Sequence, residues 1–232
     1  MSDGYDRQNP YFHYILRGIM VGDSAVGKTS LLQRMVHNSF TSLHDLTIGV
    51  EFEQTVLTVP DKNGDLKQVK LHVWDTAGME TFHSITQIYF QRCCLVFIVY
   101  DVENRTSFNN VANWVARVTQ NCKSHIEIIL VGNKCDSSRR VVSHLEGLEC
   151  AKQFGILFME TSARTGTNVE LAFKKACERI VQYTIEQVEC TTDNGIILGA
   201  LVEPVEYFRS QQLQIVRENT TDTMMKKCCT IS

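Results

Sequence analysis

Apolar residues along the chain form several continuous runs separated by mixed stretches. Residues 11–21 form an apolar, aromatic-rich run that predicts a first strand. Residues 93–100 and 126–131 are continuous apolar runs, which are typical of strands buried on both faces of a parallel sheet. Residues 157–160 indicate a last short strand.

A second pattern alternates apolar and polar residues. It covers residues 50–59 and 66–74, and the PDKNGD segment between them supplies turn residues. This arrangement predicts a β-hairpin.

Helical patterns lie between the strands. SLLQRMV, after the first strand, indicates a helix start, and further helices are predicted over residues 107–121, 145–154 and 168–187. Strands that alternate with helices indicate a doubly wound α/β sheet.

The periodic pattern stops near residue 188. We therefore expect a flexible N-terminus over residues 1–9, a domain over 10–187 and a largely flexible tail over 188–232. Within the tail, IILGALV at 196–202 either docks as a short strand or partner contact, or forms a collapsed linker. We favour the linker.

Composition narrows the class of protein. The chain has 232 residues, 44% of them hydrophobic, and a formal net charge of -3, which argues against a nucleic-acid partner. No apolar run reaches transmembrane length, and the first residues lack the apolar core of a signal peptide, so a cytosolic protein is expected.

The nine cysteines include two adjacent pairs, Cys93–Cys94 and Cys228–Cys229. They lack C-x-x-C spacing, which argues against a zinc site, and most are expected to be small core residues in a reducing compartment.

Residues 22–29, GDSAVGKT, fit the phosphate-loop pattern G-x-x-x-x-G-K-[ST] between a predicted strand and helix. The glycines let backbone N–H groups surround phosphates, Lys28 would reach the β- and γ-phosphates, and Thr29 would bind Mg²⁺. The alternative is a glycine-bearing turn with an incidental lysine.

Asp75 ends the apolar strand VKLHVWD, at the sheet edge where ligands bind in open α/β folds. It is expected to hold Mg²⁺, with Gly78 approaching the γ-phosphate. An aspartate at a strand end is otherwise often a cap or turn residue.

Residues 133–136, NKCD, follow another buried strand. The Asp136 carboxylate matches the two donors on one edge of guanine, which adenine lacks. Asn133 would hold the loop and contact the base, and the Lys134 stem would cover its face. The backbone of residues 161–164, TSAR, is a weaker candidate for contact with the guanine carbonyl, since an ordinary loop without a binding role could have the same sequence.

Together these motifs resemble the Ras superfamily of small GTPases, and the TIGVEF run at 47–52 is most similar to the Rab family of trafficking GTPases. WDTAG at 74–78 and ETSA at 160–163 add to the resemblance, which covers about residues 10–187 and the cysteine end. It implies a P-loop NTPase fold with a six-stranded, mostly parallel sheet, one antiparallel strand and flanking helices.

The resemblance also implies residue roles. Thr47 would close on Mg²⁺ and the γ-phosphate, and Phe40 would pack edge-on against guanine. The expected nucleotide-binding set is Asp23, Ser24, Ala25, Val26, Gly27, Lys28, Thr29, Ser30, Phe40, Thr47, Gly78, Asn133, Lys134, Asp136, Ser162, Ala163 and Arg164. The expected effector surface is Ile48, Phe52, Trp74 and Tyr89, for which ordinary core packing is the alternative.

The chain departs from the family pattern at four positions. Met79 replaces the usual glutamine, Thr81 the usual arginine, Leu46 a frequent serine and Arg164 the usual lysine. The glutamine orients the attacking water, and a thioether is only a weak acceptor. Slow intrinsic GTP hydrolysis is therefore expected at a catalytic set of Lys28, Thr47, Gly78 and Met79.

Two interpretations of Met79 stay open. In the favoured one, an activating protein that supplies an arginine and a glutamine restores hydrolysis, as Rab activators of the TBC type do. In the other, the protein rests mostly GTP-bound as a membrane-recruitment module.

The C-terminal pair Cys228 and Cys229 resembles a Rab prenylation end, although the last four residues also fit C-a-a-X. The implied cofactors are GTP, GDP and Mg²⁺. The implied partners are an exchange factor, an activating protein, effectors, Rab escort protein and GDP-dissociation inhibitor. The expected location is the cytoplasmic face of intracellular membranes, with an escorted cytosolic pool.

Overall fold

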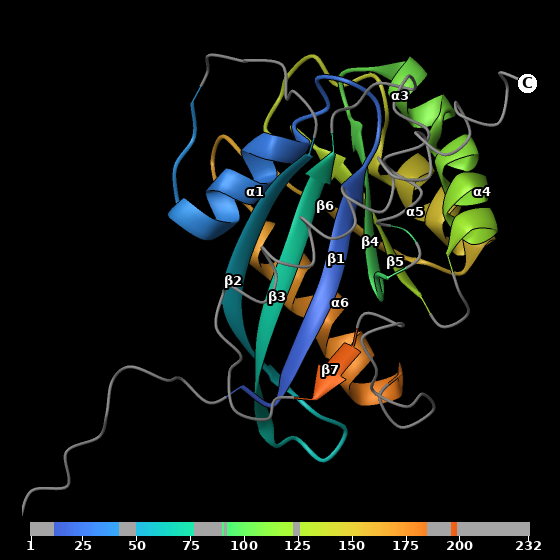
Figure 1. The fold of residues 1–232 in the computed structure, drawn as a ribbon. Coiled ribbons are helices and arrows are strands. Elements are labelled where there is room, and N and C mark those ends of the chain that lie inside the picture. The colour runs from blue at the N-terminus through green and yellow to red at the C-terminus, as the bar shows by residue number, and fades with distance from the viewer. Residues whose placement is uncertain are drawn as a thin grey trace, which may run out of the picture. The chain divides into compact units, whose positions relative to one another are not determined.

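The computed structural model describes residues 12–41, 50–76, 90, 92–122, 126–184 and 196–198. Its centre is a mixed β-sheet with strand order β2-β3-β1-β4-β5-β6 (Figure 1). These strands are β1 (Tyr14–Val21), β2 (Val50–Pro60), β3 (Leu66–Thr76), β4 (Leu95–Asp101), β5 (Glu127–Asn133) and β6 (Leu157–Glu160).

Strand directions agree with the expected fold. β3, β1, β4, β5 and β6 pair in parallel, and β2 joins β3 as an antiparallel hairpin. The prediction of six strands with one antiparallel strand is confirmed. Because the parallel strands point the same way, the loops that follow β1, β5 and β6 gather at one edge of the sheet, at the top of Figure 1, where β3 also ends.

A seventh strand, β7 (Ile196–Leu198), pairs antiparallel with the start of β1, where Leu16 is opposite Ile196. β4 pairs with β1 only from Gly18 onward, so the first residues of β1 have an open edge that β7 fills. Ile196 is buried in the core. The favoured interpretation of this stretch as a collapsed linker is therefore wrong for 196–198, and the compact unit extends to Gly199.

The helices are α1 (Lys28–His37), α3 (Arg105–Asn109), α4 (Val111–Asn121), α5 (His144–Phe154) and α6 (Val169–Arg179), the last continued by a π-helical turn, Ile180–Thr184. The helix predicted over 107–121 is thus two helices. Asn104 caps the first of them by accepting hydrogen bonds from the N–H groups of Thr106 and Ser107, at 3.0 and 3.2 Å.

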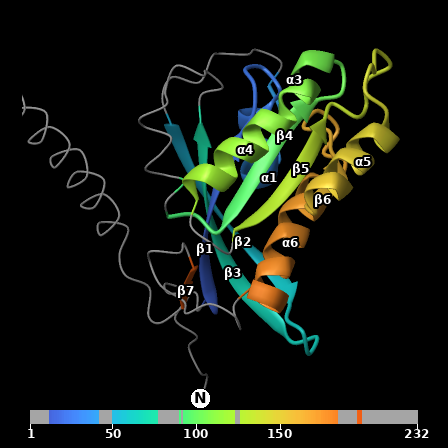
Figure 2. The same cartoon turned by 90° about the vertical axis from the view of Figure 1, so that its right-hand side faces the viewer.

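The helices cover both faces of the sheet (Figures 1 and 2). Alternate strand residues divide between two apolar clusters. One cluster contains residues of α1 and α6, such as Leu31 and Phe173, and the other contains residues of α4 and α5, such as Val115 and Ala151. This two-sided burial explains the continuous apolar runs of β4 and β5.

In the part of the chain that the structure describes, no helix is both long enough and apolar enough to cross a membrane.

Candidate functional site

The phosphate-loop motif lies between β1 and α1, as its sequence context predicts, and its two glycines have positive φ. Gly22 has φ 143°, and a Cβ there would lie 2.2 Å from the backbone oxygen of Val99. Gly27 has φ 96°, and a Cβ there would lie 2.3 Å from Nδ2 of Asn133. Both glycines are therefore required by close packing as well as by backbone conformation.

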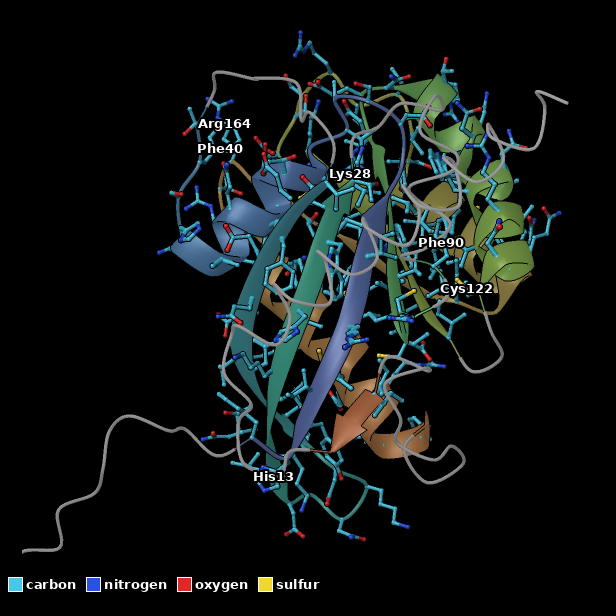
Figure 3. The ribbon with its side chains drawn as sticks, viewed as in Figure 1. His13, Lys28, Phe40, Phe90, Cys122 and Arg164 are labelled. Carbon is cyan, nitrogen blue, oxygen red and sulfur yellow. The ribbon has the colours of Figure 1, made fainter. Side chains whose placement is uncertain are left out.

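Lys28 starts α1 and is buried, with only 5% of its surface exposed (Figure 3). Its Nζ donates to the backbone oxygens of Gly22 and Asp23, at 2.9 and 2.8 Å. Burial lowers the pKa of Lys28 to about 8, although Asp75 and Asp23 oppose the shift. The ammonium group is held inside the loop by carbonyl groups, where a phosphate anion would stabilise its charge.

Thr29 and Asp75 meet beside this ammonium group. The Thr29 hydroxyl donates a hydrogen bond to Oδ2 of Asp75, which is fully buried near the end of β3. Burial raises the pKa of Asp75 to about 6, with the Thr29 hydrogen bond and Lys28 opposing the shift and Glu51 adding to it.

The other oxygen of Asp75, Oδ1, is buried and has no hydrogen-bond partner within the described ranges. A hydroxyl and a carboxylate are hard oxygen ligands of the kind that Mg²⁺ prefers. The residues present therefore fit a magnesium ion, to which Thr29 and Asp75 would contribute oxygens.

Asn133 ends β5 and connects three loops. Its Nδ2 donates to the backbone oxygen of Val26 in the phosphate loop, at 2.9 Å. Its Oδ1 accepts from the N–H of Ala163 at 3.2 Å and from the hydroxyl of Thr161 at 3.4 Å. The side chain is buried, and it fixes the end of β5 and the loop after β6 to the phosphate loop.

Lys134 and Asp136 follow Asn133 in sequence, and the first is half-buried whereas the second is exposed. Lys134, at φ 65°, donates from Nζ to the backbone oxygen of Ala25 at 3.1 Å and forms a 2.6 Å ion pair with Asp101. Ala25 also has a positive φ, 61°, which is strained for a residue other than glycine. Asp136 is exposed, and its carboxylate has no hydrogen-bond partner among the residues described. It is available to accept hydrogen bonds from a base.

The loop after β6 contains the expected Ser162, Ala163 and Arg164. The N–H of Ser162 donates to Thr167 and that of Ala163 to Asn133, so both donors already have partners inside the protein. Ser162 is buried, and its hydroxyl accepts from the N–H of Thr165 at 3.0 Å. Of these three N–H groups, only that of Arg164 has no hydrogen-bond partner among the described residues, so it is the one available to a base carbonyl.

Arg34 of α1 holds this loop in place, a role that the sequence motifs do not reveal. Its guanidinium group donates to the backbone oxygens of Ala163 and Arg164, at 2.8 and 2.9 Å, and to that of Asn38 at 2.8 Å. Phe40, two residues after Asn38, packs against the core and lies near Arg164, at the same end of the sheet as Lys28 (Figure 3). Arg34 thus brings the segment that leads to Phe40 beside the loop that contains Arg164.

The remaining phosphate-loop residues differ in exposure. Ser24 and Ala25 are exposed, Val26 is buried and Ser30 is half-buried. The Asp23 carboxylate does not bond to the loop itself. It accepts hydrogen bonds from Nδ2 of Asn110 at 2.7 Å and from Nε1 of Trp114 at 2.8 Å. The sequence does not suggest Asn110 or Trp114 as partners of Asp23. Its only signal is an acidic residue inside a phosphate-binding motif.

Two of the four expected effector-surface residues are described. Phe52 and Trp74 are directly opposite each other on β2 and β3, with ring centroids 5.3 Å apart, and Phe52 is 41% exposed. The other predictions lie outside the described residues: Thr47, Ile48, Gly78, Met79, Tyr89, Cys228 and Cys229.

The family model described as the Ras family matches residues 17–182. The matched range runs from within β1 to the turn after α6 and includes every expected site residue except the two C-terminal cysteines.

In protein stripped of nucleotide and Mg²⁺, Asp75→Asn should raise the free energy of unfolding near neutral pH. The folded-state pKa of Asp75 is raised from 3.8 to about 6. The native state therefore binds the proton more tightly than the unfolded state, and stability is lost as pH rises between these values. The shift corresponds to at most about 3 kcal/mol.

Urea unfolding at a series of pH values measures this effect. Wild type should lose stability between about pH 4 and 6, and Asp75→Asn should lose less. Asp65→Asn, in the exposed hairpin turn, is the matched control and should behave as wild type. A stripped Asp75→Asn protein that is less stable than wild type would contradict the expectation.

Proposed function

The chain belongs to the Ras family, and from that premise we propose that it is a Rab-like, GTP/GDP-switched regulator of vesicle trafficking. The family assignment makes it a small GTPase, which binds guanine nucleotides and hydrolyses GTP. The observation that carries a guanine site in this chain is Asn133, whose side chain joins the phosphate loop to the loops expected to read the base. The TIGVEF sequence supports the Rab assignment.

Each site residue would have a separate role in binding the phosphates and the metal ion. The Lys28 ammonium would exchange its two carbonyl partners for oxygens of the β- and γ-phosphates. The Thr29 hydroxyl and Asp75 carboxylate would hold Mg²⁺, which neutralises phosphate charge when bound. Loop N–H groups and the start of α1 would add positive potential. This arrangement stabilises charge on the phosphates and does not by itself position a water molecule.

Water positioning is where this chain departs from the family. Met79 cannot donate a hydrogen bond and accepts only weakly, so it cannot hold a water molecule in line with the γ-phosphate. We propose that intrinsic hydrolysis is slow and that an activating protein completes the site. The alternative is a protein that stays mostly GTP-bound, with its membrane recruitment controlled elsewhere.

Membrane attachment is proposed through prenyl groups on Cys228 and Cys229. A single lipid gives only marginal membrane binding, and the end of the chain adds just Lys226 and Lys227 as basic support. Two lipids are therefore favoured over one. The GTP-bound protein would recruit effectors through a surface that includes Phe52 and Trp74, and an escort protein and a GDP-dissociation inhibitor would handle the lipidated form.

Asp136→Asn should weaken GTP binding and favour xanthosine triphosphate. The amide offers a donor to the xanthine carbonyl where the carboxylate accepted from the guanine amine. Dissociation constants for the two nucleotides and for ATP, measured by competition with a fluorescent guanine nucleotide, test the change. Asp65→Asn serves as the control and should keep the wild-type order. Wild-type protein that binds ATP as well as GTP would show that the guanine-site assignment is wrong.

Met79→Gln should speed unaided GTP hydrolysis and leave nucleotide affinity nearly unchanged. A tenfold gain requires about 1.4 kcal/mol of barrier lowering, which positioning a water molecule can supply. Met79→Leu is the matched control, since leucine is also apolar. Single-turnover rates at saturating Mg²⁺ compare the three proteins. Equal rates for wild type and Met79→Gln would mean that another group positions the water.

The C-terminal cysteines should both carry geranylgeranyl groups in protein isolated from cells. Intact-mass analysis of the membrane fraction measures the number and type of lipids, and the double variant Cys228→Ser, Cys229→Ser should move to the cytosolic fraction. An unmodified C-terminus in the wild-type protein would overturn the membrane-anchor proposal.

A further inference from the structure

The phosphate loop contains an acidic side chain, and the structure shows where its charge is placed. Asp23 is the second residue of GDSAVGKT, and its backbone oxygen accepts a hydrogen bond from Lys28 inside the loop. A carboxylate that turned toward the bound phosphates would repel them, and the repulsion would increase with phosphate charge. The loop therefore needs a means of keeping this side chain away from the nucleotide.

Two hydrogen-bond donors at the start of α4 hold the Asp23 carboxylate. Asn110 precedes the helix, and Trp114 follows Asn110 by four residues, so both side chains lie on one face. They donate to different oxygens of the same carboxylate, Nδ2 of Asn110 to Oδ2 at 2.7 Å and Nε1 of Trp114 to Oδ1 at 2.8 Å. Both oxygens of the carboxylate thereby accept hydrogen bonds from donors outside the phosphate loop.

Asn110 lies between α3 and α4, and its backbone is helical there, with φ −78° and ψ −9°. A residue that caps a helix with its side chain normally has an extended backbone. Asn110 makes no side-chain cap bond, and its Nδ2 donates to Asp23. The carboxylate lies at the N-terminus of α4, where the helix dipole favours negative charge.

We propose that Asn110 and Trp114 are positioning residues for nucleotide binding, which hold the Asp23 carboxylate against α4 and away from the phosphates. The inference rests on the proposed guanine-nucleotide site. It also makes α4 a mechanical support of the phosphate loop, so that a partner that shifts the start of α4 would change phosphate affinity. The effect is specific to charge, and this separates it from a general role of Trp114 in packing.

The test is a double-mutant cycle between Trp114→Phe, which keeps an aromatic ring and removes the N–H donor, and Asp23→Ala, which removes the charge. Dissociation constants are measured for fluorescent GDP and for a fluorescent non-hydrolysable GTP analogue with Mg²⁺. Trp114→Phe should weaken binding about tenfold for the triphosphate and clearly less for the diphosphate. In the Asp23→Ala background the same substitution should change either constant less than twofold.

Three further measurements separate the effect of charge from packing and from loss of the fold. Raising the salt concentration should reduce the loss in Trp114→Phe, because screening weakens the repulsion from the released carboxylate. Asn110→Asp, which replaces a donor by a second anion, should weaken triphosphate binding more than Asn110→Ala. Urea unfolding of each stripped protein identifies any variant that has lost its fold.

Several results would overturn the inference. An equal loss from Trp114→Phe with and without Asp23 would mean that the indole acts through packing, and unchanged binding in Trp114→Phe would mean that the two hydrogen bonds are dispensable. Both results leave the guanine-nucleotide proposal intact as long as wild type binds the analogues. Wild type that binds neither analogue would remove the proposed function and this inference together.

Discussion

The hydrogen bonds of the Asn133 side chain to the phosphate loop and to the loop after β6 are the constraint on which the site depends. The amide donates to Val26 in the phosphate loop and accepts from Ala163 in the loop after β6, and it is buried between them. Gly27 must lack a side chain for the amide to approach this closely. One residue at the end of β5 therefore sets the distance between the phosphate-binding and base-reading parts of the nucleotide site.

A second set of contacts supports the same junction from outside. Arg34 holds the loop after β6 to α1, and Lys134 connects its own loop to the oxygen of Ala25 and to Asp101 at the end of β4. Each contact joins segments that are distant in sequence and adjacent at the carboxyl edge of the sheet. The strain at Ala25 and Lys134, both at positive φ, is maintained by these contacts. These contacts hold the loops in place from within the protein, and such preorganisation reduces the conformational entropy that is lost on binding a ligand.

Sequence patterns predicted the parts of this arrangement that depend on local chemistry. The apolar runs identified β4 and β5, the alternating segments identified the β2–β3 hairpin, and the motifs placed Lys28, Thr29, Asp75 and Asn133 at one edge. Features that depend on partners far along the chain could not be predicted. β7 is only three residues long and exists because β1 has an open edge beside its first residues. The bonds of Arg34, Asn110 and Trp114 likewise follow from the packing of α1 and α4, which no local pattern encodes.

The same packing explains why the site favours a charged ligand. Burial lowers the pKa of Lys28 and raises that of Asp75, so each charged form is disfavoured although the two groups attract each other. Asp75 keeps one buried oxygen without a hydrogen-bond partner in the described part of the chain, and Lys28 is held only by carbonyl groups there. A phosphate group would neutralise the lysine and a divalent cation would neutralise the aspartate.

Burial of these two charged groups destabilises the folded domain. Binding of Mg²⁺ and nucleotide together would therefore offset this destabilisation. Either one alone would bind less tightly, because the opposite charge would then be left uncompensated. The two buried side chains, at the start of α1 and near the end of β3, would thus couple metal and nucleotide, and Thr29, the neighbour of Lys28 in sequence, donates to Asp75.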